Sequence, residues 1–174
     1  HAALERLFQL KRRPKNNPVP FVASDVAQVE LLAVMQGALA ERLAQRFWPG
    51  PLTLVLPLAK VHPLASWSWG DSLGIRVPGS PLVRALAAHA GIPLPATSAN
   101  LSGSPPVSDP SLFPGELVET LDLIVDAGAL PPSLPSTVLS LLPPRPRVIR
   151  WGAVVRDDLL PLLPALVDEA FNED

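Results

Sequence analysis

A chain of 174 residues, of which 48% are hydrophobic and 17% charged, is long enough to bury one hydrophobic core and too apolar to be disordered as a whole. The absence of cysteine excludes a disulfide scaffold, a thiolate metal site and a cysteine nucleophile, and no apolar run reaches the roughly 20 residues of a membrane span. The lack of cysteine also fits a reducing compartment, so we expect a cytoplasmic protein that is not bound to membranes. The net charge of −2 provides no general attraction for nucleic acid, so we expect any contact with RNA to be local.

Twenty-three prolines divide the chain into short segments, because each proline fixes φ and removes a backbone donor. Apolar periodicity and end signals separate helices from strands. In chain order the predicted elements are a helix at 2–10, a strand at 19–23, a helical segment at 26–48 broken at Gly37, strands at 52–58 and 73–77, a helix at 80–91, a strand at 92–96, a helix at 115–121, strands at 122–126, 136–140 and 147–150, and a helix at 157–171. This alternation predicts an α/β fold.

The helix at 80–91 has the most complete set of end signals. Ser80 is a favourable N-cap, Pro81 suits the first helical position, and Gly91 stands just beyond the end. We therefore expect its boundaries to be accurate.

Three adjacent cations, Lys11, Arg12 and Arg13, follow the first predicted helix directly. Together they can neutralise a polyphosphate, since arginine offers a bidentate fork and lysine a point charge. Alternatively, they only complement the negative end of the helix dipole.

Further polar residues follow or occupy the predicted strands. Arg76 alternates with Ile75 and Val77, so its side chain lies on the opposite face, where it can bind a carboxylate or carbonate or simply meet solvent. The loop at 97–103 is rich in hydroxyl and amide side chains and follows a strand, which is where open α/β sheets bind ligands, although it can also be an ordinary turn. Ser136 and Thr137 begin another strand and can face the same ligand or form a local turn.

Several familiar sites are not supported by the sequence. The three histidines have no metal-ligand spacing, and we expect no protein-bound metal. The chain has no P-loop, no dinucleotide-binding glycine motif and no nucleophile elbow. A nucleotide site would therefore be of another kind.

Six blocks in this order resemble the YrdC-like family, the threonylcarbamoyl-adenylate synthases. The blocks are LKRRP at 10–14, FWPGPLT at 47–53, SLGIRVP at 72–78, TSANLSG at 97–103, PSTV at 135–138 and RWG at 150–152. The resemblance implies a twisted mixed sheet with flanking helices and a concave, positively charged face. It covers a domain at 1–153, and we expect 154–174 to form a C-terminal helix packed on that domain.

The resemblance also implies a reaction. Family members use ATP with Mg²⁺, L-threonine and bicarbonate to make threonylcarbamoyl-AMP and pyrophosphate. The product serves tRNA threonylcarbamoyladenosine modification through a downstream threonylcarbamoyl transferase complex. Such chemistry needs charge neutralisation and positioning but no covalent enzyme intermediate.

The motifs carry residue roles over to this chain as expectations. The catalytic residues are expected to be Lys11, Arg13 and Arg76. The ATP-binding residues are expected to be Lys11, Arg12, Arg13, Ser72, Ser98, Asn100 and Arg150. The threonine-binding residues are expected to be Asn17, Arg76, Thr97 and Ser136.

Two departures from the family pattern bear on activity. Family members begin with a strand and a segment resembling P-T-[DE]-T-x-Y-G-L, which nothing in this chain matches, and Asn17 stands where many synthases have histidine. The leading hypothesis is an active synthase. The alternatives are a non-catalytic paralogue that binds nucleotide, tRNA or double-stranded RNA, and a carbamoyl-adenylate domain of a larger maturation protein. Threonine- and bicarbonate-dependent ATP consumption separates the synthase from the non-catalytic paralogue.

Overall fold

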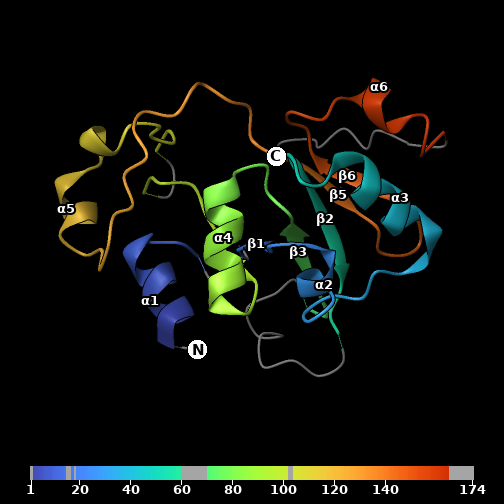
Figure 1. Cartoon of the computed structure of the whole chain (residues 1–174), viewed down its shortest axis with the longest axis horizontal. Coiled ribbons are helices and arrows are strands. Elements are labelled where there is room, and N and C mark those ends of the chain that lie inside the picture. The colour runs from blue at the N-terminus through green and yellow to red at the C-terminus, as the bar shows by residue number, and fades with distance from the viewer. Residues whose placement is uncertain (1, 15–16, 18, 60–69, 102–103, 165–174) are drawn as a thin grey trace. The chain divides into compact units, whose positions relative to one another are not determined.

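The computed structural model describes residues 2–14, 17, 19–59, 70–101 and 104–164 (Figure 1). The chain divides into two units. Unit 1 comprises His1–Pro18 and Thr97–Ser133, and unit 2 comprises Val19–Ala96 and Leu134–Asp174. The β-sheet belongs to unit 2.

The sheet has six strands in the order β4-β1-β3-β2-β5-β6. Their bounds are β1 Phe21–Val22, β2 Leu52–Pro57, β3 Ser72–Arg76, β4 Leu94–Pro95, β5 Thr137–Ser140 and β6 Arg147–Arg150. The β1–β3 and β2–β5 pairs are parallel, whereas β1–β4, β2–β3 and β5–β6 are antiparallel. The predicted mixed α/β fold is therefore confirmed.

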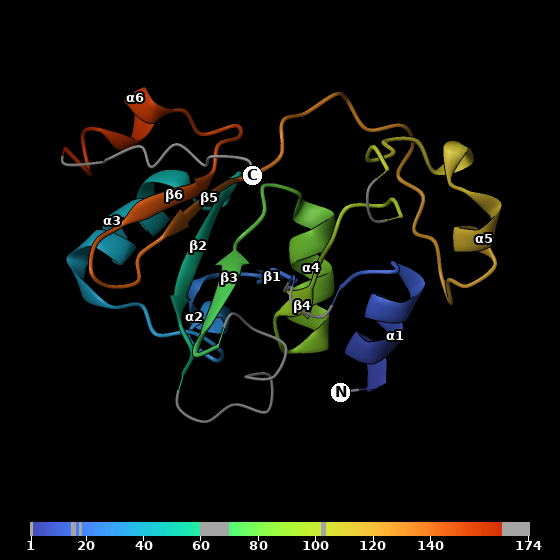
Figure 2. The same cartoon turned by 180° about the vertical axis from the view of Figure 1, so that it is seen from behind.

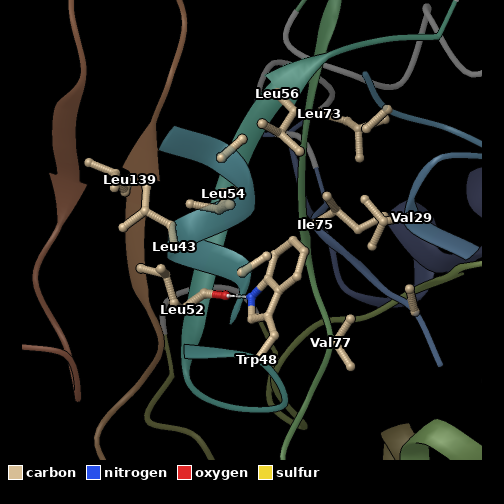
Figure 3. Close-up of a cluster of buried hydrophobic side chains, with 14 of the residues drawn as sticks. Val29, Leu43, Trp48, Leu52, Leu54, Leu56, Leu73, Ile75, Val77 and Leu139 are labelled. Carbon is tan, nitrogen blue, oxygen red and sulfur yellow. Dashed lines mark hydrogen bonds between the residues drawn. The ribbon is translucent and has the colours of Figure 1, made fainter. Parts of the chain in front are cut away.

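One face of this sheet carries the hydrophobic core of unit 2. The register aligns Leu54 with both Ile75 and Leu139, and all three are fully buried. Helices α2 (Val26–Val29) and α3 (Gly37–Phe47) contribute apolar side chains to the same cluster, as Figure 3 shows. The Trp48 indole closes one end of it by donating from Nε1 to the Leu52 carbonyl at 2.6 Å.

The opposite face of the sheet is partly polar. Cross-strand partners point to the same side of a sheet, and the register pairs Val138 with Thr53. The β5–β6 register is irregular after Val138, which pairs with Arg150, and the Arg150 side chain contacts Ser136. One step beyond the Leu54–Ile75 pair, Thr53 lies opposite Arg76. Three polar side chains from different strands therefore share this face.

Helix α4 (Pro81–Ala90) confirms the end signals predicted for 80–91. The Ser80 hydroxyl accepts a hydrogen bond from the Val83 amide at 3.4 Å, and Gly91 has φ 71°. Figure 2 shows α4 beside β1. The Gln28 side chain joins it to α2 by donating to the Ala87 carbonyl at 2.8 Å.

Unit 1 contains α1 (Ala2–Leu10), the 3₁₀ helix η2 (Pro110–Leu112) and α5 (Gly115–Val118). Leu4 and Phe8, one helical turn apart, are the buried residues of α1, whereas Leu7 and Leu10 are half-buried. The helix predicted at 115–121 ends earlier, because the Thr120 amide and hydroxyl both bond to the Leu117 carbonyl in a tighter turn.

The strand predicted at 122–126 is wrong. This segment is irregular, and its Leu123 side chain is 77% exposed. A strand needs a neighbour for its backbone donors and acceptors, and within the described ranges none pairs with it. Apolar composition alone does not provide such a neighbour.

Other boundaries also differ from the predictions. The predicted break between two helices is present, but it lies at 30–36, where Ala33 bridges Leu58 just after β2, and Gly37 begins α3. Helix α6 spans only Arg156–Leu159, and 165–171 of the predicted terminal helix lie outside the described residues.

In the described part of the chain, no helix is long and apolar enough to cross a bilayer.

Candidate functional site

Lys11 in unit 1 is held at the end of α1 by its backbone and its side chain. Its amide continues the helical pattern by bonding to the Leu7 carbonyl at 3.0 Å. The side chain is buried, and its ammonium group donates to the Ser98 carbonyl and, at 2.9 Å, to Asn100 Oδ1. The fold thus joins residues that are 87 and 89 positions apart.

Asn100 organises the loop that contacts Lys11. Its Oδ1 also accepts from the Ser98 hydroxyl at 2.5 Å, and its Nδ2 donates to the Ser104 carbonyl. Three of the predicted ATP-binding residues, Lys11, Ser98 and Asn100, therefore form one hydrogen-bonded group. Positions 102 and 103 of the predicted loop lie outside the described residues.

The protonated form of Lys11 is less favoured in the folded protein than in water. Burial lowers the pKa of Lys11, and the nearby charge of Arg13 lowers it further. Burial also lowers the pKa of Arg13. A bound anion would relieve both effects.

The other predicted residues of unit 1 have different partners. Arg13 donates from Nε to the Asn17 carbonyl and from Nη2 to Asn17 Oδ1, both at 2.7 Å. Arg12, with φ 50°, forms an exposed ion pair with Glu116 at 2.9 Å. Arg12 and Arg13 also line a pocket of about 350 Å³ on α1. The remaining predicted residue of unit 1, Thr97, is half-buried.

In unit 2, Ser136 lies at the centre of a second polar group. Its hydroxyl oxygen lies 2.9 Å from Thr53 Oγ1 and 3.3 Å from Arg150 Nη2. Arg150 Nη2 also donates to the Ser136 carbonyl at 2.8 Å. The predicted residues Ser136 and Arg150 thus contact each other directly, and Thr53, which the sequence analysis did not select, contacts Ser136.

The segment that follows Arg150 holds the backbone around Ser136. The Ala153 amide donates to the Pro135 carbonyl at 3.0 Å, and Thr137 Oγ1 donates to the Val154 carbonyl at 2.6 Å. A Cβ atom at Gly152 would lie 2.1 Å from the Pro135 carbonyl oxygen. The glycine of the RWG block is therefore required by close backbone packing.

Arg76 is half-buried at the end of β3. Burial lowers its pKa most, and the charge of Arg150 lowers it further. Ser72 is buried at the start of the same strand, four residues away and so on the same side. The mutual repulsion of the Arg76 and Arg150 charges would be relieved by an anionic oxygen group between them.

The predicted site residues fall in both units. Of those expected to bind ATP, Ser72 and Arg150 belong to unit 2 and the rest to unit 1; of those expected to bind threonine, Asn17 and Thr97 belong to unit 1, Arg76 and Ser136 to unit 2. Their roles stay predictions.

Thr53 could have been found by its sequence context, since it is the polar residue in the apolar run of β2.

A further pocket in unit 2, of about 490 Å³, lies at the turn between β5 and β6 and includes Arg145 and Arg147. Sequence reasoning did not select these residues. Within the described ranges, no cluster of three or more histidine, aspartate or glutamate side chains is placed to hold a metal ion.

Comparisons with known proteins agree with the fold. Residues 1–152 match the Sua5/YciO/YrdC family model, described as "Telomere recombination". A threonylcarbamoyl-AMP synthase of Pyrococcus abyssi is 33% identical over 90% of this chain and 46% of its own length, and one from Xanthomonas oryzae pv. oryzae is 37% identical over 90% and 80%. The crystal structure of P. abyssi Sua5 complexed with L-threonine matches with a TM-score of 0.85 and 32% identity, covering 95% of this chain and 49% of that one.

The chain thus spans about half the length of the archaeal relative. Because the family model matches most of the 174 residues, and the matched solved structure has the same mixed fold, the chain belongs to the Sua5/YciO/YrdC family.

Proposed function

We propose that this protein is a threonylcarbamoyl-AMP synthase, which makes threonylcarbamoyl-AMP and pyrophosphate from ATP, L-threonine and bicarbonate. The names of its relatives and the threonine complex of P. abyssi Sua5 support this function. The observation that carries it is that each unit holds a cationic side chain partly or wholly withdrawn from solvent, with Lys11 buried in unit 1 and Arg76 half-buried in unit 2. Among the described residues no carboxylate forms an ion pair with Lys11 or Arg76, and the pKa of each is lowered.

The proposed role of the Lys11 group is to bind the nucleotide. Lys11 and Arg13 would neutralise phosphate oxygens, while Ser98 and Asn100 would hydrogen-bond to the nucleotide. Arg12, Ser72 and Arg150 are further candidates for this substrate. Mg²⁺ enters as part of the ATP substrate.

The proposed role of Arg76 and Ser136 is to bind threonine and its carbamate, with Asn17 and Thr97 as further candidates. The threonine amine attacks the carbon of bicarbonate, and loss of water leaves a carbamate. A carbamate oxygen then attacks the α-phosphorus of ATP, and the bond to pyrophosphate breaks. Charge neutralisation and alignment of the reactants lower the barrier, since no covalent enzyme intermediate forms.

We also propose that the product serves tRNA modification in the cytoplasm, through a separate threonylcarbamoyl transferase. The carbamoyl carbon of a mixed carbamic–phosphoric anhydride is an activated acyl group. A nucleophilic amine of an adenine base can therefore displace AMP.

The test is threonine-dependent and bicarbonate-dependent release of pyrophosphate from ATP, measured on the complete natural protein. We expect release only when all three substrates are present. Binding of ATP without such release would contradict the synthase and favour a nucleotide-binding paralogue without catalysis.

Arg76→Lys tests the proposed threonine side of the reaction. Lysine keeps the charge but loses the bidentate fork, so we expect threonine-dependent turnover to fall about tenfold or more with ATP affinity unchanged. The matched control is Arg84→Lys in α4, because Arg84 bonds to the Pro78 and Gly79 carbonyls. Wild-type threonine kinetics in Arg76→Lys would refute the bidentate role.

A further inference from the structure

Thr53 is a buried polar residue in the apolar strand β2. Its exposure is 2%, while Leu52, Leu54 and Val55 beside it are buried in the usual way for a central strand. Its Oγ1 lies 2.9 Å from Ser136 Oγ, across the parallel pairing of β2 and β5. A buried hydroxyl at this position needs a reason, since desolvation without a partner is costly.

The direction of this hydrogen bond follows from burial. Among the described residues, Ser136 Oγ is the acceptor for the Thr53 hydroxyl, and a buried donor left without an acceptor is strongly unfavourable. Thr53 therefore donates and Ser136 accepts. Ser136 is only half-buried, so its own proton can reach another acceptor.

Arg150 is a second hydrogen-bond donor to the Ser136 hydroxyl oxygen. An arginine can only donate, and its Nη2 lies 3.3 Å from Ser136 Oγ and 2.8 Å from the Ser136 carbonyl. The Ser136 oxygen thus faces two donors, which occupy both of its lone pairs. Its proton is left to donate outward, toward a group that accepts.

We propose that Thr53 is a positioning residue that makes Ser136 an obligate hydrogen-bond donor to an anionic oxygen of the amino-acid substrate. This inference rests on the proposed synthase function. A carboxylate and a carbamate both present acceptor-only oxygens, which match such a donor. Thr53 acts on the substrate through Ser136.

The test is the nearly isosteric substitution Thr53→Val, measured by calorimetric binding of L-threonine and by steady-state kinetics on the complete natural protein. We expect the KM and Kd for threonine to rise about fivefold to tenfold, as for one lost hydrogen bond, with ATP affinity unchanged. Thr53→Ser keeps the hydroxyl and should restore threonine binding.

A double-mutant cycle with Ser136→Ala separates positioning from a structural effect. Once Ser136 has lost its hydroxyl, Thr53→Val should weaken threonine binding by less than twofold. A structural role would instead lower the melting temperature, weaken binding of both substrates and persist in the Ser136→Ala background. Should Thr53→Val fail to fold, Thr53→Ala takes its place in the same cycle.

The outcomes distinguish the two proposals. If the wild-type protein binds threonine and Thr53→Val binds it equally well, the positioning role is overturned while the synthase stands. The positioning role is also overturned if Thr53→Val weakens threonine binding equally in the wild-type and Ser136→Ala backgrounds. If the wild-type protein neither binds nor uses threonine, the synthase proposal fails, and the positioning role with it.

Discussion

At the scale of single residues, Lys11 is the most informative group of unit 1. Its ammonium is buried against Ser98 and Asn100, and its pKa is lowered by burial and then by Arg13. A cation with a lowered pKa binds its proton more weakly in the folded than in the unfolded chain. Its contribution to stability therefore increases as pH rises through the folded-state pKa.

Binding of a phosphate should raise the pKa of Lys11 again, because a nearby anion favours the charged ammonium. Below the pKa of Lys11 in the free protein, the ammonium is charged before and after binding, and ATP affinity is constant. As pH rises through that pKa, binding requires proton uptake and affinity falls. We expect this fall on the alkaline side of neutrality and below the ordinary pKa of lysine, where the ATP phosphates are already ionised.

Calorimetry in two buffers of different ionisation enthalpy measures the proton uptake. The control is Lys11→Arg, which stays charged throughout and should bind ATP with little dependence on alkaline pH. An identical pH profile for the wild type and Lys11→Arg would show that Lys11 does not contact the phosphates.

At the scale of elements, the segment after β6 fixes the start of β5. In this segment the backbone of Val154 bonds to the hydroxyl of Thr137 in β5. The close approach of the two segments leaves no space for a side chain at Gly152. We expect Gly152→Ala to displace Pro135 and Ser136, destabilising the protein by about 1 to 3 kcal/mol and weakening threonine binding.

Denaturant unfolding and threonine calorimetry measure both effects. Gly115→Ala is the matched control, since a Cβ there meets nothing within 4 Å and position 115 begins helix α5. Alanine favours a helix over glycine, so the control should be neutral or slightly stabilising. Unchanged stability of Gly152→Ala would contradict the close packing.

At the scale of the whole molecule, the two units differ in how much regular structure they contain. Unit 2 has the six-stranded sheet and a core that includes Leu43, Leu54 and Ile75, all fully buried. In unit 1, 121–133 has no regular structure, and most of its apolar side chains are exposed. Local stability should therefore differ between the units.

Amide hydrogen exchange tests this expectation. We expect amides of β2 and β3 to exchange at least about 100-fold more slowly than those of 121–133, because opening of the strands requires disruption of the core. Leu54→Ala should destabilise the sheet by about 2 to 5 kcal/mol and reduce that protection. Equal exchange rates in both regions would contradict the difference.

The sequence by itself determined the features that depend on near neighbours. The caps of α4 at Ser80 and Gly91, the strand at 147–150 and the amphipathic α1 were all predictable, because their signals lie within a few residues of each element. The six ordered blocks were also sufficient to recognise the family that the comparison with residues 1–152 confirms. The cation cluster at Lys11 was visible as a run of adjacent charges.

Only the tertiary structure decided the features that depend on distant partners. Apolar composition predicted a strand at 122–126, yet a strand forms only where another strand pairs with it. Likewise Gly37 begins α3, because the preceding segment pairs with the end of β2. Thr53 and Ser136 are 83 residues apart, and their contact exists because β2 and β5 are parallel neighbours in one register. That register is set by core packing across the sheet, which local sequence patterns do not encode.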